Sequence, residues 1–408
     1  MKKFFLFASA ALVLASCSSE AEEAVIKPNE TPEEEVLELT EIKLGGGAPT
    51  ASAETRAANQ VTAWNDTEVG IFGVNEYARA TNNDWSLPPS RGNMEITAEN
   101  AVILLNESAT VTNDDTVRFD AGPIYFPRTN NNNYGYTFLG YYPYIATRPT
   151  TNADSISVTG VFDGTQDIMA GKATSATQLN NGNNIGYNAK YIREYRNQNS
   201  GTGYPNINIA FKHLTSKIDV QLKKGASYKN EMCDVYAAYF KVEKDYTLTF
   251  AKDIANNSVT TSLAFKGDTV KAYAIGGGDF VENKSYKQND IVKYGGQYYK
   301  FNSDYTGSWG GADVILADPF EAEAGPSFNN KYTIFVTPDP QEGATKTLYL
   351  ILKNDINTDT PVTITSPTGG FKPGTAYTVT VTINGPEEIK VTATIVDWDN
   401  GDEVGAEI

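Results

Sequence analysis

Apolar and polar residues alternate with a period of two along much of this chain. From Tyr377 to Ile383 apolar side chains alternate with threonines, and the same period returns from Ile389 to Ile395. This pattern is typical of half-buried β-strands, and the Asn-Gly-Pro turn at 384–386 predicts that the two strands form a hairpin. Leu348–Leu352 is apolar at every position, which predicts a central strand between two packed layers.

The alternation changes phase once near the middle of the chain. Apolar residues fall on odd positions from Ile207 to Phe211 and on even positions from Ile218 to Leu222. A shift of one residue turns every side chain to the opposite face of a sheet. We therefore expect a bulge or a change of sheet between His213 and Lys217.

The strand pattern predicts an all-β protein with almost no helix. A chain of 408 residues exceeds the usual size of one hydrophobic core, so we expect two domains, built as β-sandwiches. The chain has two cysteines. If Cys17 is modified as argued next, Cys233 has no partner and no internal disulfide supports the fold.

The first seventeen residues read as an export signal. Lys2 and Lys3 precede an apolar run from Phe4 to Leu14, and Leu14-Ala15-Ser16-Cys17 resembles the bacterial lipobox. The lipobox reading predicts a lipid on the thiol of Cys17 and a protein held at the outer membrane. An ordinary signal peptide with a chance cysteine is the alternative. The apolar run is too short to cross a bilayer, which takes about 20 residues.

An acidic tether follows at 18–56, with ten glutamates against three lysines or arginines. Its composition predicts a solvated linker. Within it, Val36–Leu44 has the pattern of a strand, whose apolar residues are Leu37, Leu39, Ile42 and Leu44. Gly45–Gly47 is predicted to end this strand, and the bond between Arg56 and Ala57 is predicted to be an accessible protease site.

Composition and motifs argue against catalysis and nucleic-acid binding. The formal net charge is −17, which disfavours nucleic acid and anionic membrane surfaces as partners. The only histidine, His213, is predicted to be buried and hydrogen-bonded. We find no nucleophile elbow, phosphate loop or dinucleotide fingerprint, and predict no catalytic residue, no metal site and no cofactor. The chain is predicted not to be an enzyme.

Four groups of residues resemble those of the fimbrillins, the lipoprotein pilins of Gram-negative anaerobes, and follow one another along the chain in the order expected for that family. Phe211–Ile218 matches a Phe-x-His-x-x-Ser-Lys-aliphatic element. The other matching segments are Tyr141–Tyr144, Asp167–Ala170, and Lys372–Tyr377 together with Ile395–Trp398. The resemblance covers nearly the whole chain.

The resemblance implies two transthyretin-like β-sandwich domains in tandem, at 57–225 and 226–408. In that family an arginine-specific protease removes a propeptide, and a terminal strand of another pilus subunit fills the groove that the propeptide strand leaves. The matching strand here is Val36–Leu44, and the matching cut lies between Arg56 and Ala57. After Trp398 follows a short acidic stretch, which would suit a tip or accessory subunit better than a bulk pilin.

An aromatic segment at about 280–320 is predicted to be an insert in the second domain. Tyr286–Tyr299 resembles the small chitin-binding-type carbohydrate module, although Asn289 replaces its glycine. The resemblance implies exposed aromatic rings that bind sugar, for which Tyr299, Tyr305 and Trp309 are the candidates. The alternative is that these rings only fill a small core.

Three functions therefore remain at this point. The first is a fimbrial subunit that contributes to adhesion. The second is a cell-surface lipoprotein that binds host or bacterial glycans and never polymerises. The third is a glycoside-processing enzyme, for which no carboxylate pair stands out among 50 acidic residues.

Overall fold

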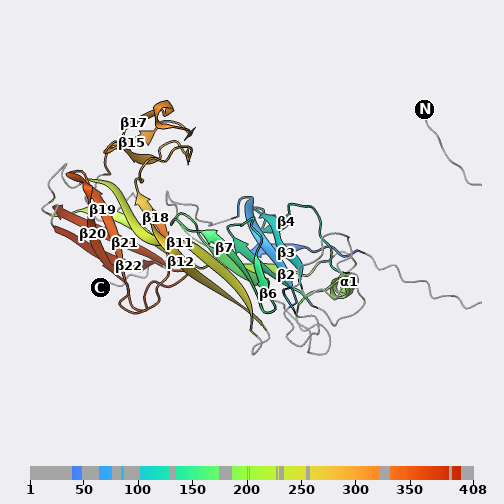
Figure 1. The fold of residues 1–408 in the computed structure, drawn as a ribbon. Helices are drawn as coiled ribbons and strands as arrows, with labels where there is room; N and C mark the ends of the chain where they lie inside the picture. The colour runs from blue at the N-terminus through green and yellow to red at the C-terminus, as the bar shows by residue number, and fades with distance from the viewer. Residues whose placement is uncertain are drawn as a thin grey trace, which may run out of the picture. The chain divides into compact units, whose positions relative to one another are not determined.

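The computed structural model confirms that the protein is all-β (Figure 1). It describes residues 39–47, 64–75, 84–86, 102–127, 135–173, 186–199, 201, 203–226, 228, 234–253, 258–320, 331–385 and 388–396. These residues form strands β1 to β22, the short helix α1 and one 3₁₀ turn, η1.

A closed barrel forms the N-terminal half. Its strands, in spatial order, are β1 (Leu44–Gly47), β4 (Thr116–Phe119), β3 (Val102–Val111), β2 (Thr67–Val74), β5 (Thr137–Tyr142), β8 (Met169–Ala173) and β9 (Asn208–His213), which returns to β1. The barrel has its own apolar core, in which Trp64 and Phe211 meet edge to face at 5.0 Å. Helix α1 (Ala189–Gln198) contributes Ile192 to this core, and the side chain of Asn188 caps its first turn. The sequence analysis did not predict α1.

Two further sheets share a second core. One consists of β18 (Tyr332–Val336), β10 (Ser216–Lys224), β21 (Ala376–Gly385) and β22 (Glu388–Val396). The other consists of β20 (Asp355–Thr365), β19 (Thr345–Leu352), β11 (Val235–Asp253), β7 (Ser155–Val161) and β6 (Thr150–Asn152), with β12 (Ser258–Ile275) paired to β11. The predicted hairpin is confirmed as β21 and β22, and the predicted central strand as β19.

The predicted change of phase is a change of sheet. Strand β9 closes the barrel, whereas β10, which begins three residues later, pairs with β18 and β21. The chain thus leaves the barrel at Leu214 and Thr215, and this point does not coincide with the expected domain boundary at 225. Strands β6 and β7, although they precede β9 in sequence, also lie outside the barrel.

At this change of sheet His213 is buried and hydrogen-bonded, as predicted. Its Nδ1 lies 2.9 Å and 2.8 Å from the two carboxylate oxygens of Asp167, which is fully buried. Asp167 lies two residues before β8, and His213 is the last residue of β9. These two strands pair with each other, with Met169 opposite His213. The pair therefore ties together two strands at the end of the barrel.

The aromatic insert lies between β12 and β18 and builds small sheets of its own. They consist of β13 (Ser285–Tyr286) with β16 (Tyr305–Thr306), and β14 (Ile291–Tyr294), β15 (Gln297–Phe301) and β17 (Val314–Leu316), with η1 (Trp309–Gly311) between them. Tyr286, Val292 and Phe301 form its core. The ring of Tyr298 stacks on Tyr236 of β11 at 4.9 Å, which attaches the insert to the larger sheet.

Candidate functional site

Strand β1 closes the barrel by pairing on both of its edges. It is antiparallel to β4, with Leu44 opposite Val117, and parallel to β9, with Gly45 opposite Asn208. The amide of Gly45 donates to the carbonyl of Ile207 at 2.9 Å, and that of Gly46 to Asp115 at 2.8 Å. Without β1, strands β4 and β9 would both have an unpaired edge.

The residues before β1 continue the same contact. The amide of Ile42 donates to the carbonyl of Ile124 at 2.8 Å, and the amide of Phe126 donates to the carbonyl of Thr40 at 2.9 Å. The hydroxyl of Tyr204 donates to the carbonyl of Glu41 at 2.8 Å. Main-chain hydrogen bonds therefore hold the segment from residue 40 to residue 47, which we call the closing segment.

Two of the four predicted propeptide side chains enter the barrel core. Ile42 and Leu44 are 3% and 4% exposed, whereas Leu39 is 49% exposed. Leu37 lies outside the described residues, as do Cys17, Arg56 and Ala57. Within the described part, the regular strand of this segment is Leu44–Gly47, and Glu41 forms an isolated bridge with Tyr125 before it.

The three glycines that were expected to break the strand instead form it. A Cβ atom on Gly45 would lie 2.1 Å from Oδ1 of Asn208, and one on Gly46 would lie 2.8 Å from Cγ1 of Val111. Both distances are far below van der Waals contact. The strand can lie this close to its neighbours because these positions lack side chains.

A pocket of about 370 Å³ lies beside the closing segment. It is lined by Glu41–Leu44, by β4, and by Gly122 and Pro123. Its lining lies on the side of β4, and no residue of β9 contributes to it.

The aromatic insert holds the three predicted sugar-binding residues in one ring cluster. Trp309 stacks on Tyr294 at 4.1 Å and meets Tyr299 edge to face at 4.9 Å. The hydroxyl of Tyr305 donates to the carbonyl of Ser308. All three predicted rings are half-buried rather than exposed. Trp309 packs on Tyr299 and on Phe280, whereas Tyr305 stacks on Phe301 at 5.8 Å. The exposed ring is Tyr294, which the sequence analysis did not select.

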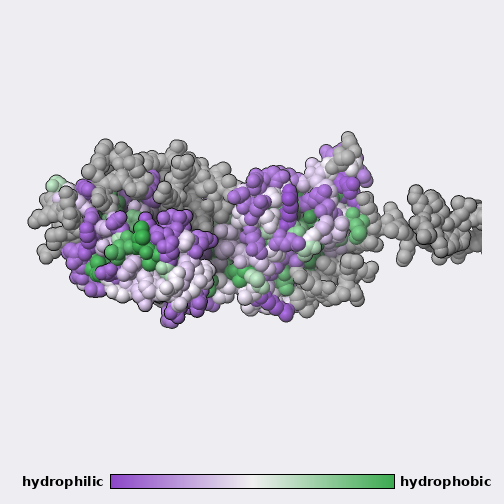
Figure 2. All heavy atoms as spheres, turned by 90° about the horizontal axis from the view of Figure 1, so that it is seen from above, coloured by the Kyte–Doolittle hydropathy of each residue, from purple (hydrophilic) through white to green (hydrophobic). Residues whose placement is uncertain are grey.

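Exposed apolar side chains gather on this same insert. They are Val281, Ile315 and Leu316, of which Leu316 is 63% exposed. Figure 2 shows a hydrophobic patch, in green, among hydrophilic residues in the left half of the view, where Figure 1 also draws the insert. Apolar side chains clustered on a surface often mark a binding face.

Metal-binding and membrane-spanning features are not found in the described ranges. Those residues contain no group of three His, Cys, Asp or Glu side chains that could hold a metal ion. None of the helices among them is long and apolar enough to cross a bilayer.

Comparison with known proteins identifies the class of protein. A family model described as fimbrillin-like matches residues 55–398, and the chain belongs to this family. It is therefore a fimbrial subunit, of a family whose role is structural rather than enzymatic. The model of the prokaryotic membrane lipoprotein lipid attachment site matches residues 1–18, which makes the protein an exported lipoprotein of the cell surface. No curated protein matches the chain in sequence.

Solved structures that resemble the chain come from species of Bacteroides and Parabacteroides. A candidate cell adhesion protein of Bacteroides uniformis shares 15% identity over 88% of this chain and 98% of its own, with a TM-score of 0.43. A fimbrial protein of Bacteroides vulgatus shares 12% identity over 87% of this chain and 99% of its own, with a TM-score of 0.38. A fimbrial assembly protein of Parabacteroides distasonis shares 8% identity over 90% of this chain and 98% of its own, with a TM-score of 0.36. Such distant likenesses carry no functional argument.

Proposed function

We propose that this fimbrial subunit assembles by strand exchange, in which proteolysis after Arg56 releases the closing segment and another pilus subunit fills the groove. The observation that carries the proposal is the position of β1, which alone joins β4 to β9. Its removal would leave two unpaired strand edges beside an apolar cleft, and a donor strand would satisfy both at once.

The energetics of the groove support exchange. Burial of Ile42 and Leu44 contributes on the order of 3–6 kcal/mol, at about 1.5–3 kcal/mol per side chain. A released subunit would regain a similar amount from a donor strand that places apolar side chains in the same positions.

The proposal implies three partners. An arginine-specific protease would cut between Arg56 and Ala57, other pilus subunits would supply the donor strand, and the outer membrane would hold the precursor through a lipid on Cys17.

The test is cleavage with an arginine-specific protease. The wild-type chain should yield a body that begins at Ala57, lose the closing segment and enter larger assemblies when mixed with a partner pilin. Amides of β4 and β9 should then exchange faster until a donor strand binds. Arg56→Lys is the matched control, because it should resist this protease and still be cut by trypsin at the same bond.

Two results would contradict the proposal. One is a trimmed body that stays monomeric beside every partner pilin. The other is a closing segment that remains bound after the cut, with β4 and β9 still protected. A native N-terminus at lipidated Cys17 instead of Ala57 would favour the tethered glycan-binding lipoprotein.

A second function, glycan binding by the insert, is favoured by the stacked pair of Tyr294 and Trp309. Sugars present apolar CH faces to such rings, and Tyr294 is 43% exposed. Tyr294→Ala and Trp309→Ala should abolish retention on a glycan array. Tyr125→Ala, which removes an exposed ring outside the insert, should leave retention unchanged. Absence of retention by the wild type would favour a purely packing role for the rings.

A further inference from the structure

The closing segment presents one row of residues to the barrel core. Ile42, Leu44 and Gly46 form this row, because side chains alternate between the two faces of an extended segment, and all three residues are buried. Ile42 and Leu44 pack among the apolar side chains of the barrel. The row therefore consists of two large side chains followed by a position with no side chain.

Two buried residues occupy the space in front of Gly46. A Cβ atom on Gly46 would lie 2.8 Å from Cγ1 of Val111 and 3.6 Å from Nε1 of Trp64. Val111 is fully buried in β3, and the indole of Trp64 is fixed against Phe211 at 5.0 Å. Neither side chain can move aside without disturbing a close-packed core. A larger residue at position 46 would therefore overpack this end of the barrel.

Gly45, on the opposite face, is less constrained. A Cβ atom there would meet Oδ1 of Asn208, but this amide is the end of an exposed, flexible side chain that can rotate away. Neither Gly45 nor Gly46 has a positive φ, so other residues can adopt both backbone conformations. The need for glycine at position 46 thus comes from its neighbours, and position 45 provides a comparison.

Main-chain contacts of the closing segment do not depend on its side chains. The amides at positions 42, 45 and 46 donate hydrogen bonds to carbonyls on either side of the segment. The hydroxyl of Tyr204 donates to the carbonyl of Glu41. Any extended strand can form these bonds, except where a proline removes an amide. They supply affinity, whereas the row that faces the core supplies selectivity.

We propose that the barrel groove selects the donor strand of a partner pilin by a glycine at the position of Gly46, with large apolar residues two and four positions before it. Val111 and Trp64 impose the glycine. This inference rests on the proposed strand exchange and names the sequence pattern of the strand that the groove accepts. In the orientation of β1, a donor strand with a third large residue in its apolar row does not fit.

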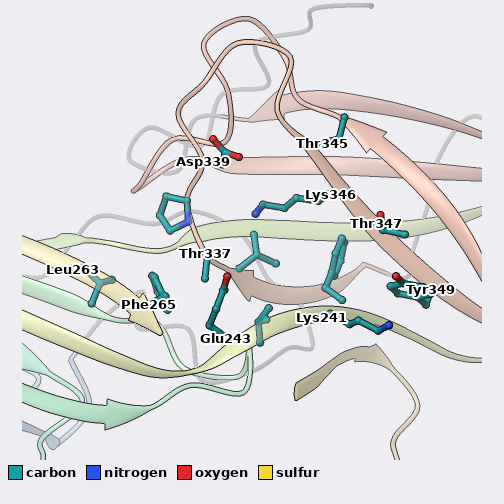
Figure 3. A pocket seen from close by; sticks show the side chains of 14 residues that line it. Lys241, Glu243, Leu263, Phe265, Thr337, Asp339, Thr345, Lys346, Thr347 and Tyr349 are labelled. Atoms are coloured by element: carbon teal, nitrogen blue, oxygen red, sulfur yellow. The ribbon is translucent and has the colours of Figure 1, made fainter. Parts of the chain in front are cut away.

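The cavity of about 550 Å³ in the second half of the molecule differs from this groove (Figure 3). Lys346 extends into it, and Glu243 and Asp339 also line it. An apolar row placed there would cover charged side chains, which is costly when they gain no partner. The pattern of two large residues and a glycine therefore belongs to the barrel groove.

Peptide binding to the full chain, cut by the arginine-specific protease, tests the proposal. The probe is a fluorescent peptide with the sequence of residues 39–47, added in excess so that it replaces the closing segment and its anisotropy rises. Gly46→Ala in the peptide should weaken binding at least about fivefold, as expected for an overpacked core. Gly45→Ala is the matched control and should change the affinity by less than about twofold.

A compensating change in the groove separates steric selection from effects on the free peptide. Val111→Ala in the chain should restore binding of the Gly46→Ala peptide, because it removes the methyl groups that the new Cβ would meet. Binding of the unmodified peptide to the same variant shows that the groove is intact. In a partner pilin, replacement of the matching glycine by alanine should slow assembly in the same way.

The outcomes distinguish this inference from the strand exchange on which it rests. Equal affinities of the two alanine peptides, or no recovery with Val111→Ala, would overturn the selection and leave strand exchange intact. A partner pilin that assembles with a large residue at this position would also overturn it. If the unmodified peptide never entered the groove, strand exchange itself would be contradicted, and the selection with it.

Discussion

At the scale of single residues, Leu39 and Leu44 show how one sequence pattern leads to two environments. Both are leucines of the predicted propeptide strand, yet Leu39 faces solvent and Leu44 packs in the barrel core. The difference arises because, among the described residues of the segment, main-chain hydrogen bonds to neighbouring strands begin at residue 40. Burial at this site depends on pairing as well as on hydrophobicity.

This contrast predicts unequal costs of truncation. Leu44→Ala should lower the free energy of unfolding by about 2–5 kcal/mol, because it removes buried methyl groups and leaves a cavity. Leu39→Ala should change it by no more than about 0.5 kcal/mol. Urea denaturation of the uncleaved chain measures both. Equal effects would mean that the closing segment does not contribute to the barrel core.

Gly46 allows a second prediction at this scale. Gly46→Ala should destabilise the uncleaved chain by about 1–3 kcal/mol, because its Cβ would press on Val111. Combined with Val111→Ala, the same change should cost much less than it does alone, since the obstructing methyl groups are gone. A double-mutant cycle measures this coupling, and strict additivity would refute a close contact between the two positions.

At the scale of elements, the insert behaves as a small unit attached to the long hairpin of β11 and β12. It has its own core around Phe301 and contacts β11 through Tyr298 and Tyr236. A hydrogen bond of 2.8 Å from Lys293 Nζ to the carbonyl of Ile356 adds a second attachment, to β20. Each contact lies outside the core shared by the two large sheets.

The attachment can therefore be weakened without unfolding the sheets. Tyr236→Ala should raise hydrogen exchange and protease sensitivity within 279–317, while the melting temperature of the main transition falls by only a few degrees. Phe301→Ala is the comparison, because it should unfold the insert itself. If Tyr236→Ala collapsed the main transition instead, the insert would be part of the larger core.

At the scale of the whole molecule, both large apolar cores contain buried tyrosines. Burial raises the pKa of Tyr141 and Tyr246 above the ordinary value of a phenol, and raises that of Tyr273 to about 12. A group whose pKa is raised by folding stabilises the native state below its unfolded pKa of about 10. That stability is lost as the pH rises toward the folded value.

The raised pKa values of these tyrosines predict that the protein unfolds at alkaline pH. Tyrosine ionisation should leave the free energy of unfolding unchanged up to about pH 9.5 and lower it steeply between about pH 10 and 12. Absorbance of tyrosinate at 295 nm should rise together with loss of the β-sheet circular dichroism signal. Tyr246→Phe should flatten the fall, and tyrosinate that formed well before unfolding would contradict the buried positions.

The local pattern of the sequence determined the fold class, the hairpin of β21 and β22, the change of phase after His213 and the lipoprotein signal. These features depend on which face of each strand is apolar, and a period of two records that directly. Helix α1 was missed because it is short, although the Asn188 cap was a usable signal.

Only the tertiary structure decided what each strand pairs with. The pairing of β1 with β9, the use of Gly45 and Gly46 in a tight strand, and the packing of Trp309 on Tyr294 all join residues distant in sequence or depend on backbones that approach each other closely. Local periodicity specifies a buried face but not the partner that buries it, because the partner is selected by the packing of the whole sheet.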